Sequence, residues 1–130
     1  MKIAAAASVC MLCMGVYATA QDQKQPVIAC NLKAISSAER QRYNDLIEQL
    51  RSAVKMRSEL PTLPTGYTYM VDSGQIGLKD VAEWIALERL CCPFLAFELS
   101  VAADPGDYSL ALTGPEGVKA LLREEFPSRR

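Results

Sequence analysis

Two adjacent cysteines, Cys91 and Cys92, are the residues of this sequence best suited to chemistry. Glu88 precedes them by three and four positions, so on a helix its carboxylate lies over both thiols. A third cysteine, Cys30, lies far upstream. Soft metals prefer thiolate ligands, and zinc accepts three thiolates together with a carboxylate or a water molecule. These four residues therefore predict a site for a soft metal or metalloid, with mercury, copper(I) and zinc as the candidate ions.

The surroundings of the cysteines argue against thiol catalysis. The sequence contains no histidine, which excludes a Cys-His nucleophile of the familiar kind. Cys91 and Cys92 stand just before Pro93, at the expected end of a helix, where the negative end of the helix dipole raises the pKa of a thiol. We therefore expect a binding protein rather than an enzyme, and the sequence identifies no reaction.

A disulfide is the main alternative use of these cysteines. Cys30 can pair with either Cys91 or Cys92, closing a long loop that stabilises the fold by up to about 4 kcal/mol in the chain-entropy model. The protein would then be a disulfide-stapled binding or interaction module without chemistry of its own. A thiol-disulfide oxidoreductase is a further alternative, and a Cys91–Cys92 disulfide is a minor variant. One disulfide leaves one cysteine over, so the disulfide and metal hypotheses do not exclude each other.

The N-terminus has the pattern of a secretory signal peptide. Lys2 is followed by an apolar run over residues 3–17, and Ala18-Thr19-Ala20 matches a cleavage site. The apolar run is too short for a membrane-spanning helix, which needs about 20 residues. We expect residues 1–20 to be removed, with Cys10 and Cys13, and the remaining chain to be periplasmic or secreted. Residues 21–26 are polar and predict a disordered leader.

Length and charge limit the remaining possibilities. The chain has 130 residues, half of them hydrophobic, which is enough for one core but not for two domains. We therefore expect a single domain over residues 27–128. The formal net charge of -1 provides no field that would attract nucleic acid or, after signal cleavage, an anionic membrane. The expected partner is a metal ion or an unidentified protein, and a homodimer is an open possibility.

The hydrophobic pattern predicts an α+β fold. Alternating or short apolar segments predict strands over residues 27–32, 66–72, 94–102 and 108–112. Helical spacing predicts helices over residues 36–58, 78–91 and from 113 onward. The order β-α-β-α-β-β-α, with a hairpin near the end, predicts a two-layer sandwich with a mostly antiparallel sheet of about four strands and three helices.

Local signals refine these boundaries. Ser36 and Glu39 fit a capping box at the start of the first helix, and Pro115 fits the first turn of the last one. The aromatic residues are expected in the core. For Glu88 the alternative to a ligand is a rim carboxylate paired with Arg89 or Lys79.

The chain also resembles a small bacterial domain family of unknown function. The resemblance rests on an early cysteine in Ala29-Cys30-Asn31-Leu32, on an E-R-x-C-C-P-F-L-x-F core over residues 88–97, and on a T-G-P-E-G helix start over residues 113–117. It covers about the whole chain after the signal peptide. Members of this type are associated with heavy-metal resistance, which implies that Cys30, Glu88, Cys91 and Cys92 are the functional residues. A signal peptide departs from the cytoplasmic location expected of the family.

Overall fold

The computed structural model describes residues 28–55, 63–103 and 106–127. These ranges contain three α-helices, four β-strands and a short 3-10 helix. In chain order they are η1 (Leu32–Ala34), α1 (Ser37–Ala53), β1 (Val54–Lys55), β2 (Gly66–Val71), α2 (Leu78–Cys91), β3 (Ala96–Ser100), β4 (Tyr108–Thr113) and α3 (Val118–Glu125). The predicted signal peptide over residues 1–20 and the leader over 21–26 lie outside the described residues.

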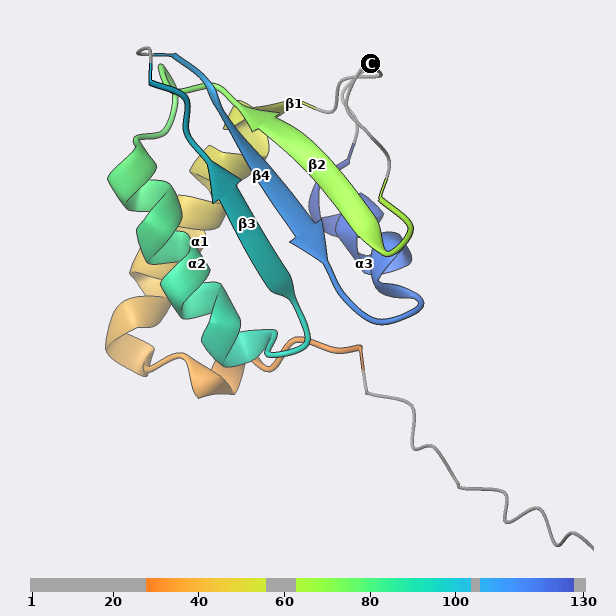
Figure 1. Ribbon diagram of the computed structural model, residues 1–130. Coiled ribbons are helices and arrows are strands. Elements are labelled where there is room, and N and C mark those ends of the chain that lie inside the picture. Colours follow the sequence, from red (N-terminus) through yellow and green to blue (C-terminus); the bar gives the residue numbers. More distant parts are fainter. Residues whose placement is uncertain (1–27, 56–62, 104–105, 128–130) are drawn as a thin grey trace, which may run out of the picture.

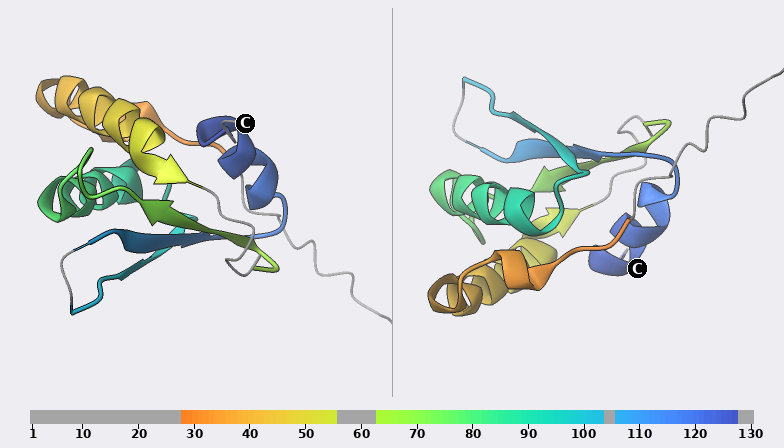
Figure 2. Two further views of the ribbon diagram at one scale, coloured as in Figure 1. Left: turned by 90° about the horizontal axis from the view of Figure 1, so that it is seen from above. Right: turned by 90° about the horizontal axis from the view of Figure 1, so that it is seen from below.

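The four strands form one antiparallel sheet in the order β1-β2-β4-β3. Figure 1 shows β4 between its two long neighbours, and both views of Figure 2 show the helices on one side of the sheet. The predicted α+β class, with a four-stranded antiparallel sheet and three helices, is confirmed. None of the helices in the described ranges is long and apolar enough to cross a membrane.

The core lies between the sheet and the helices. Tyr108, Leu110 and Leu112 alternate along β4 and are buried, because every second residue of a strand faces the helices. They meet the apolar faces of the first two helices, whose buried residues include Tyr43, Leu46, Ile47, Leu50, Val81, Trp84 and Leu87. Trp84 and Tyr69 are buried as expected, whereas Tyr67, Phe94 and Phe97 are only partly buried against the core.

The segment before α1 differs from its prediction. A strand was expected over residues 27–32, but residues 28–31 have no regular structure and Leu32 begins η1. The Asn31 side chain accepts a hydrogen bond from the Lys33 backbone N–H (3.2 Å) and caps this short helix. The Asn31 backbone N–H donates to the carbonyl of Cys91 (2.8 Å). The segment is therefore held against the end of α2, with no place in the sheet.

Both ends of α1 differ from the helix predicted over residues 36–58. The Ser36 hydroxyl donates to the Glu39 carboxylate, so the two side chains bond to each other and the predicted capping box does not form. The helix ends at Ala53, before the predicted residue 58, because Val54 and Lys55 pair with Val71 and Met70 as β1. Residues 56–58 lie outside the described ranges.

Other elements are shorter than predicted. The strand expected over residues 94–102 is β3, from Ala96 to Ser100, and Val101 is 53% exposed. Near the end of α2, Leu90 is 51% exposed, although its spacing in the helix follows that of the buried Leu87. The last helix begins at Val118, so Pro115 is not in its first turn. The residue before it, Gly117, has a φ of 93°, in the left-handed region that favours glycine.

Candidate functional site

The two adjacent cysteines lie where α2 ends. Cys91 is the last residue of the helix and Cys92 is its C-cap, with a non-helical φ of -122° and ψ of 66°. The Cys92 N–H still donates to the Glu88 carbonyl (2.7 Å), and the Cys92 carbonyl accepts from Leu95 N–H (3.1 Å). Both cysteines are buried. On a continuous helix the side chains of adjacent residues diverge. The chain leaves the helix at Cys92, so the side chains of Cys91 and Cys92 can lie close together.

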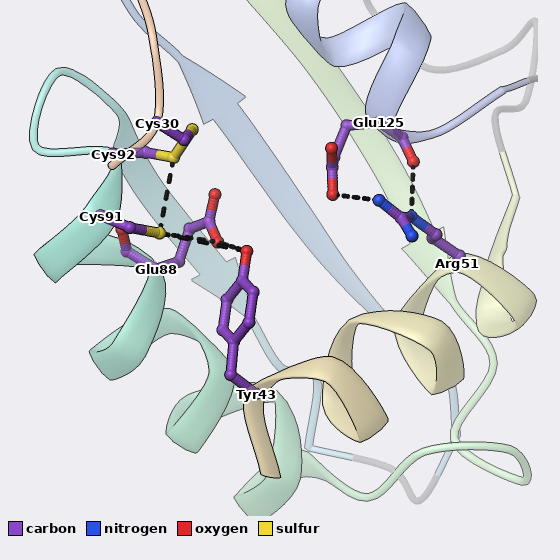
Figure 3. Close-up of a disulfide and its surroundings, with 7 residues drawn as sticks. All are labelled: Cys30, Tyr43, Arg51, Glu88, Cys91, Cys92 and Glu125. Atoms are coloured by element: carbon purple, nitrogen blue, oxygen red, sulfur yellow. Dashed lines mark hydrogen bonds and ion pairs between the residues drawn. A yellow bond between two sulfur atoms is a disulfide. The ribbon is translucent and has the colours of Figure 1, made fainter. Parts of the chain in front are cut away.

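Cys92 forms a disulfide with Cys30 (Figure 3). Sequence patterns left open whether Cys91 or Cys92 would be the partner. The bond joins residues 62 positions apart and fastens the segment before η1 to the end of α2. Cys30 itself is exposed and lies in the segment without regular structure, where a strand had been predicted. The site therefore combines one exposed cysteine residue with two buried ones.

Cys91 is the free cysteine among the described residues, and its thiol lies close to Cys92 and Glu88. Its Sγ lies 3.7 Å from Cys92 Sγ and 3.7 Å from Glu88 Oε2, and its thiol also faces the Glu88 carbonyl oxygen at 3.4 Å. Burial, followed by the nearby Glu88 carboxylate, raises the pKa of Cys91 to about 11. The sequence also predicted a raised thiol pKa, but from the helix dipole, whereas burial is the largest cause in the structure.

Glu88 is buried, which corrects its interpretation as a rim carboxylate. Only 3% of the residue is exposed, and no ion pair to Glu88 occurs among residues 28–55, 63–103 and 106–127. Its partner is instead the Tyr43 hydroxyl, which donates to Oε2 (2.7 Å) from α1. Burial raises the pKa of Glu88, although the Tyr43 hydrogen bond acts in the opposite direction. In Figure 3 the second carboxylate oxygen points away from Tyr43 and Cys91.

The donor atoms are close enough to share one ion. One atom each from Cys30, Glu88 and Cys92 lies within 4.8 Å of the other two, and Cys91 Sγ is 3.7 Å from Cys92 Sγ. Two thiolates bound to the same tetrahedral zinc ion, with bonds of about 2.3 Å, are about 3.7 Å apart. The Cys91 and Cys92 sulfurs thus have the spacing of two zinc ligands, whereas the Cys30 and Cys92 sulfurs are joined by the disulfide in this structure.

A cavity of about 310 Å³ opens beside the cluster. Cys30 and Glu88 line one end of it, and Arg51 and Glu125 form an ion pair on another part of the wall (Figure 3). Trp84 also lines the cavity. It is fully buried, and its indole N–H has no hydrogen-bond partner in the described part of the chain.

All four residues predicted from the sequence come together, but four further residues around them were not foreseen. Tyr43 was expected only in the core, like the other aromatic residues, and its role depends on the packing of α1 against α2. Arg51 and Glu125 are 74 positions apart, so no local pattern connects them. Trp84 was expected only in the core. It lies four positions before Glu88, so helical spacing was the one signal that placed it near the site.

Comparison of this chain with protein-family models, with curated proteins and with solved structures gave no match. The resemblance drawn from the E-R-x-C-C-P-F-L-x-F core therefore stays a prediction, and the site is interpreted from its own geometry.

Proposed function

We propose that this protein is an exported single-domain binding protein, and that its reduced cysteines hold one soft metal or metalloid ion. Cys30, Cys91 and Cys92 would supply three sulfur ligands and Glu88 a carboxylate oxygen. The observation that carries this proposal is the close grouping of these four donors around the end of α2. Mercury, copper(I) and zinc are the candidate ions, because each accepts thiolate ligands.

The proposed site has two states. With the Cys30–Cys92 disulfide formed, only the Cys91 thiol is free among the described residues. Two electrons and two protons from a dithiol reductant would convert the disulfide into two thiols, giving a set of three. Bound thiols must lose their protons, so the affinity of the site depends on pH. A cation would compensate the cost of placing several negative charges in a buried position.

Export is proposed from the N-terminal pattern, and it predicts a defined mature chain. The protein should be recovered from the periplasm with Gln21 as its first residue, which intact mass measurement of the purified protein tests. Recovery with Met1 or Met-less Lys2 at the start would contradict this part of the proposal. Loss of Cys10 and Cys13 with the signal also removes two competing thiols from the binding measurement.

Metal titration of the reduced protein tests the binding proposal. We expect one equivalent of zinc to bind in competition with a chromophoric chelator, and Cys92→Ser and Cys91→Ser to weaken that binding by at least tenfold. Glu88→Gln removes the proposed oxygen ligand, and Glu98→Gln is its matched control. Glu98 is exposed on β3, so Glu98→Gln should have no effect on metal affinity. If both cysteine variants keep wild-type affinity for zinc, copper(I) and mercury, the proposal is wrong.

A disulfide-stapled binding module is the second candidate, and the Cys30–Cys92 bond is the observation that favours it. In that case Cys92→Ser would reduce stability while no metal bound tightly to the reduced wild type. An oxidoreductase is disfavoured, because the buried Cys91 thiol resists deprotonation and thiolates are the reactive form.

A further inference from the structure

The cavity beside the cysteines combines metal-binding atoms at one end with an apolar wall. Cys30 and Glu88 belong to the proposed ligand set and also line the cavity. The wall contains aliphatic and aromatic side chains from the helices and the sheet, including Ile47, Trp84, Leu112, Leu122 and Phe126. A bare metal ion fills none of this apolar space. The arrangement suits a ligand that has both a thiol-binding atom and an organic group.

The size of the cavity indicates how large the organic group is. A cavity of about 150 Å³ accepts benzene, so about 310 Å³ can hold one aromatic ring with space remaining, beside the polar side chains of Asn44, Glu48, Arg51 and Glu125 that also line it. A six-membered ring bonded directly to the thiol-bound atom would extend from Cys30 and Glu88 toward the apolar wall. Figure 3 shows that the disulfide and the Glu88 carboxylate face the same region as the Arg51–Glu125 pair, which is also part of the lining.

Trp84 is the second observation that points to a ligand. Its side chain is 0% exposed to solvent, and its indole N–H donates to no acceptor in the described ranges. Trp84 already packs edge-to-face with Phe97 and Phe126, at centroid distances of 5.8 and 6.1 Å. The indole is fully buried, so an aryl ring bound in the cavity would pack against it in the same way, and accept a weak N–H···π hydrogen bond, once the intervening side chains shift.

We propose that the reduced site binds monoaryl compounds of a soft metalloid, with arsenic held by thiolates and the aryl ring in the cavity. This inference rests on the proposed thiol site and names its substrate class. For phenylarsine oxide, the thiols of Cys30 and Cys92 form two As–S bonds, and their two protons leave with the oxide oxygen as water. Arsenic stays trivalent, so the step needs no oxidant or reductant. Arsenite would form a third As–S bond, to Cys91, and would place no ring in the cavity.

The test compares phenylarsine oxide with arsenite on the reduced, exported protein. Leu121→Phe and Ile47→Phe each add a ring to the lining of the cavity. They should weaken phenylarsine oxide binding roughly tenfold or more, the loss expected when a buried phenyl group is displaced, and leave arsenite binding within about twofold. Ala120→Phe is the matched control, because it adds the same ring at an exposed neighbouring position of α3. It should change neither affinity.

A second measurement uses the wild type and does not depend on the folding of a variant. Trp84 is the only tryptophan, so its indole N–H gives a single NMR resonance. Phenylarsine oxide should shift that resonance and give contacts between phenyl and indole protons. Equal weakening of both arsenicals by the cavity variants, or a Trp84 signal that phenylarsine oxide leaves in place, would overturn the aryl assignment. If neither arsenical binds better to the wild type than to Cys30→Ser/Cys92→Ser, the thiol site itself is wrong.

Discussion

At the scale of single residues, the state of Cys91 follows from its neighbours. The thiol is buried, lies 3.7 Å from the Glu88 carboxylate, and has a pKa raised to about 11. Both the burial and the nearby carboxylate disfavour a thiolate. In the oxidised, metal-free protein we expect iodoacetamide at pH 8 to leave Cys91 unmodified until the protein is denatured. Peptide mass spectrometry measures this directly, and rapid labelling of Cys91 in the folded protein would contradict the described packing.

Glu88 gives a prediction for the pH dependence of stability. Its folded pKa is raised by burial above the unfolded value of about 4.3. The folded state therefore binds the proton more tightly, and this contribution to stability is fully present below about pH 4. It is lost as pH rises through the raised folded pKa. Denaturant unfolding of the oxidised protein should show this loss in the wild type and not in Glu88→Gln.

The comparison with Glu88→Gln isolates this one group. Asp72 and Glu83 have lowered pKa values, so their contributions disappear only as pH falls below the unfolded value. They are present in both proteins and cancel in the difference. Glu98→Gln should retain the wild-type pH profile. A profile for Glu88→Gln that parallels the wild type would mean that Glu88 is not held in a buried environment.

The site residues were predictable from the sequence only in part. Helical spacing alone identifies the two adjacent cysteines and Glu88, one turn earlier, as one group of side chains. The choice of Cys92 over Cys91 as the partner of Cys30 depends on where the helix ends and how the chain leaves it, within one residue. The burial of Glu88 depends on Tyr43, which reaches it across 45 positions of sequence. Such a long-range contact leaves no trace in local periodicity.

At the scale of elements, the disulfide connects the irregular segment before η1 to the C-terminal end of α2. The loop of 62 positions is long, and the chain-entropy model gives a stabilisation of about 4 kcal/mol. We expect Cys30→Ser to lower the free energy of unfolding by about this amount. Reductant should lower the stability of the wild type similarly and leave that of Cys30→Ser unchanged. Equal stability of the oxidised wild type and the variant would show that this bond does not form.

The start of α3 depends on a glycine. Gly117 has a φ of 93°, and a Cβ atom there would lie 3.1 Å from Ile28 Cδ1. Gly117→Ala should therefore destabilise the protein by about 1–2 kcal/mol, since L-residues resist this conformation. Gly106→Ala is the control, because a Cβ there meets nothing within 4 Å. Chemical denaturation of both variants tests the prediction, and an equal effect at the two positions would contradict it.

The elements themselves were predictable where periodicity is strong. The predicted bounds of α2 and of the strand that begins at Gly66 agree closely with the structure, because their apolar residues repeat at helical and alternating spacing. The segment around Cys30 was misassigned because a short apolar run fits a strand or an irregular stretch equally well. Only its contacts with the end of α2 decide between them. Val54 likewise fits the helical spacing, but in the structure it pairs with Val71 of β2 and belongs to β1.

At the scale of the whole molecule, the α+β class follows from the succession of elements, whereas the strand order follows from packing. The order β1-β2-β4-β3 places the hairpin strand β4 in the middle and puts all three helices on one face (Figures 1 and 2). This arrangement brings α1, α2 and α3 around one cavity and places the end of α2 beside it. The proposed ligand set and the apolar wall are therefore consequences of the same helix layer.

The most direct test of the central claim is X-ray absorption spectroscopy of the reduced protein, prepared without residues 1–20, with one equivalent of zinc. The proposed site predicts three sulfur ligands at about 2.3 Å and one oxygen ligand, and the loss of one sulfur in Cys91→Ser. Zinc surrounded only by oxygen and nitrogen, or a sulfur shell that Cys91→Ser leaves unchanged, would contradict a site built from Cys30, Cys91, Cys92 and Glu88.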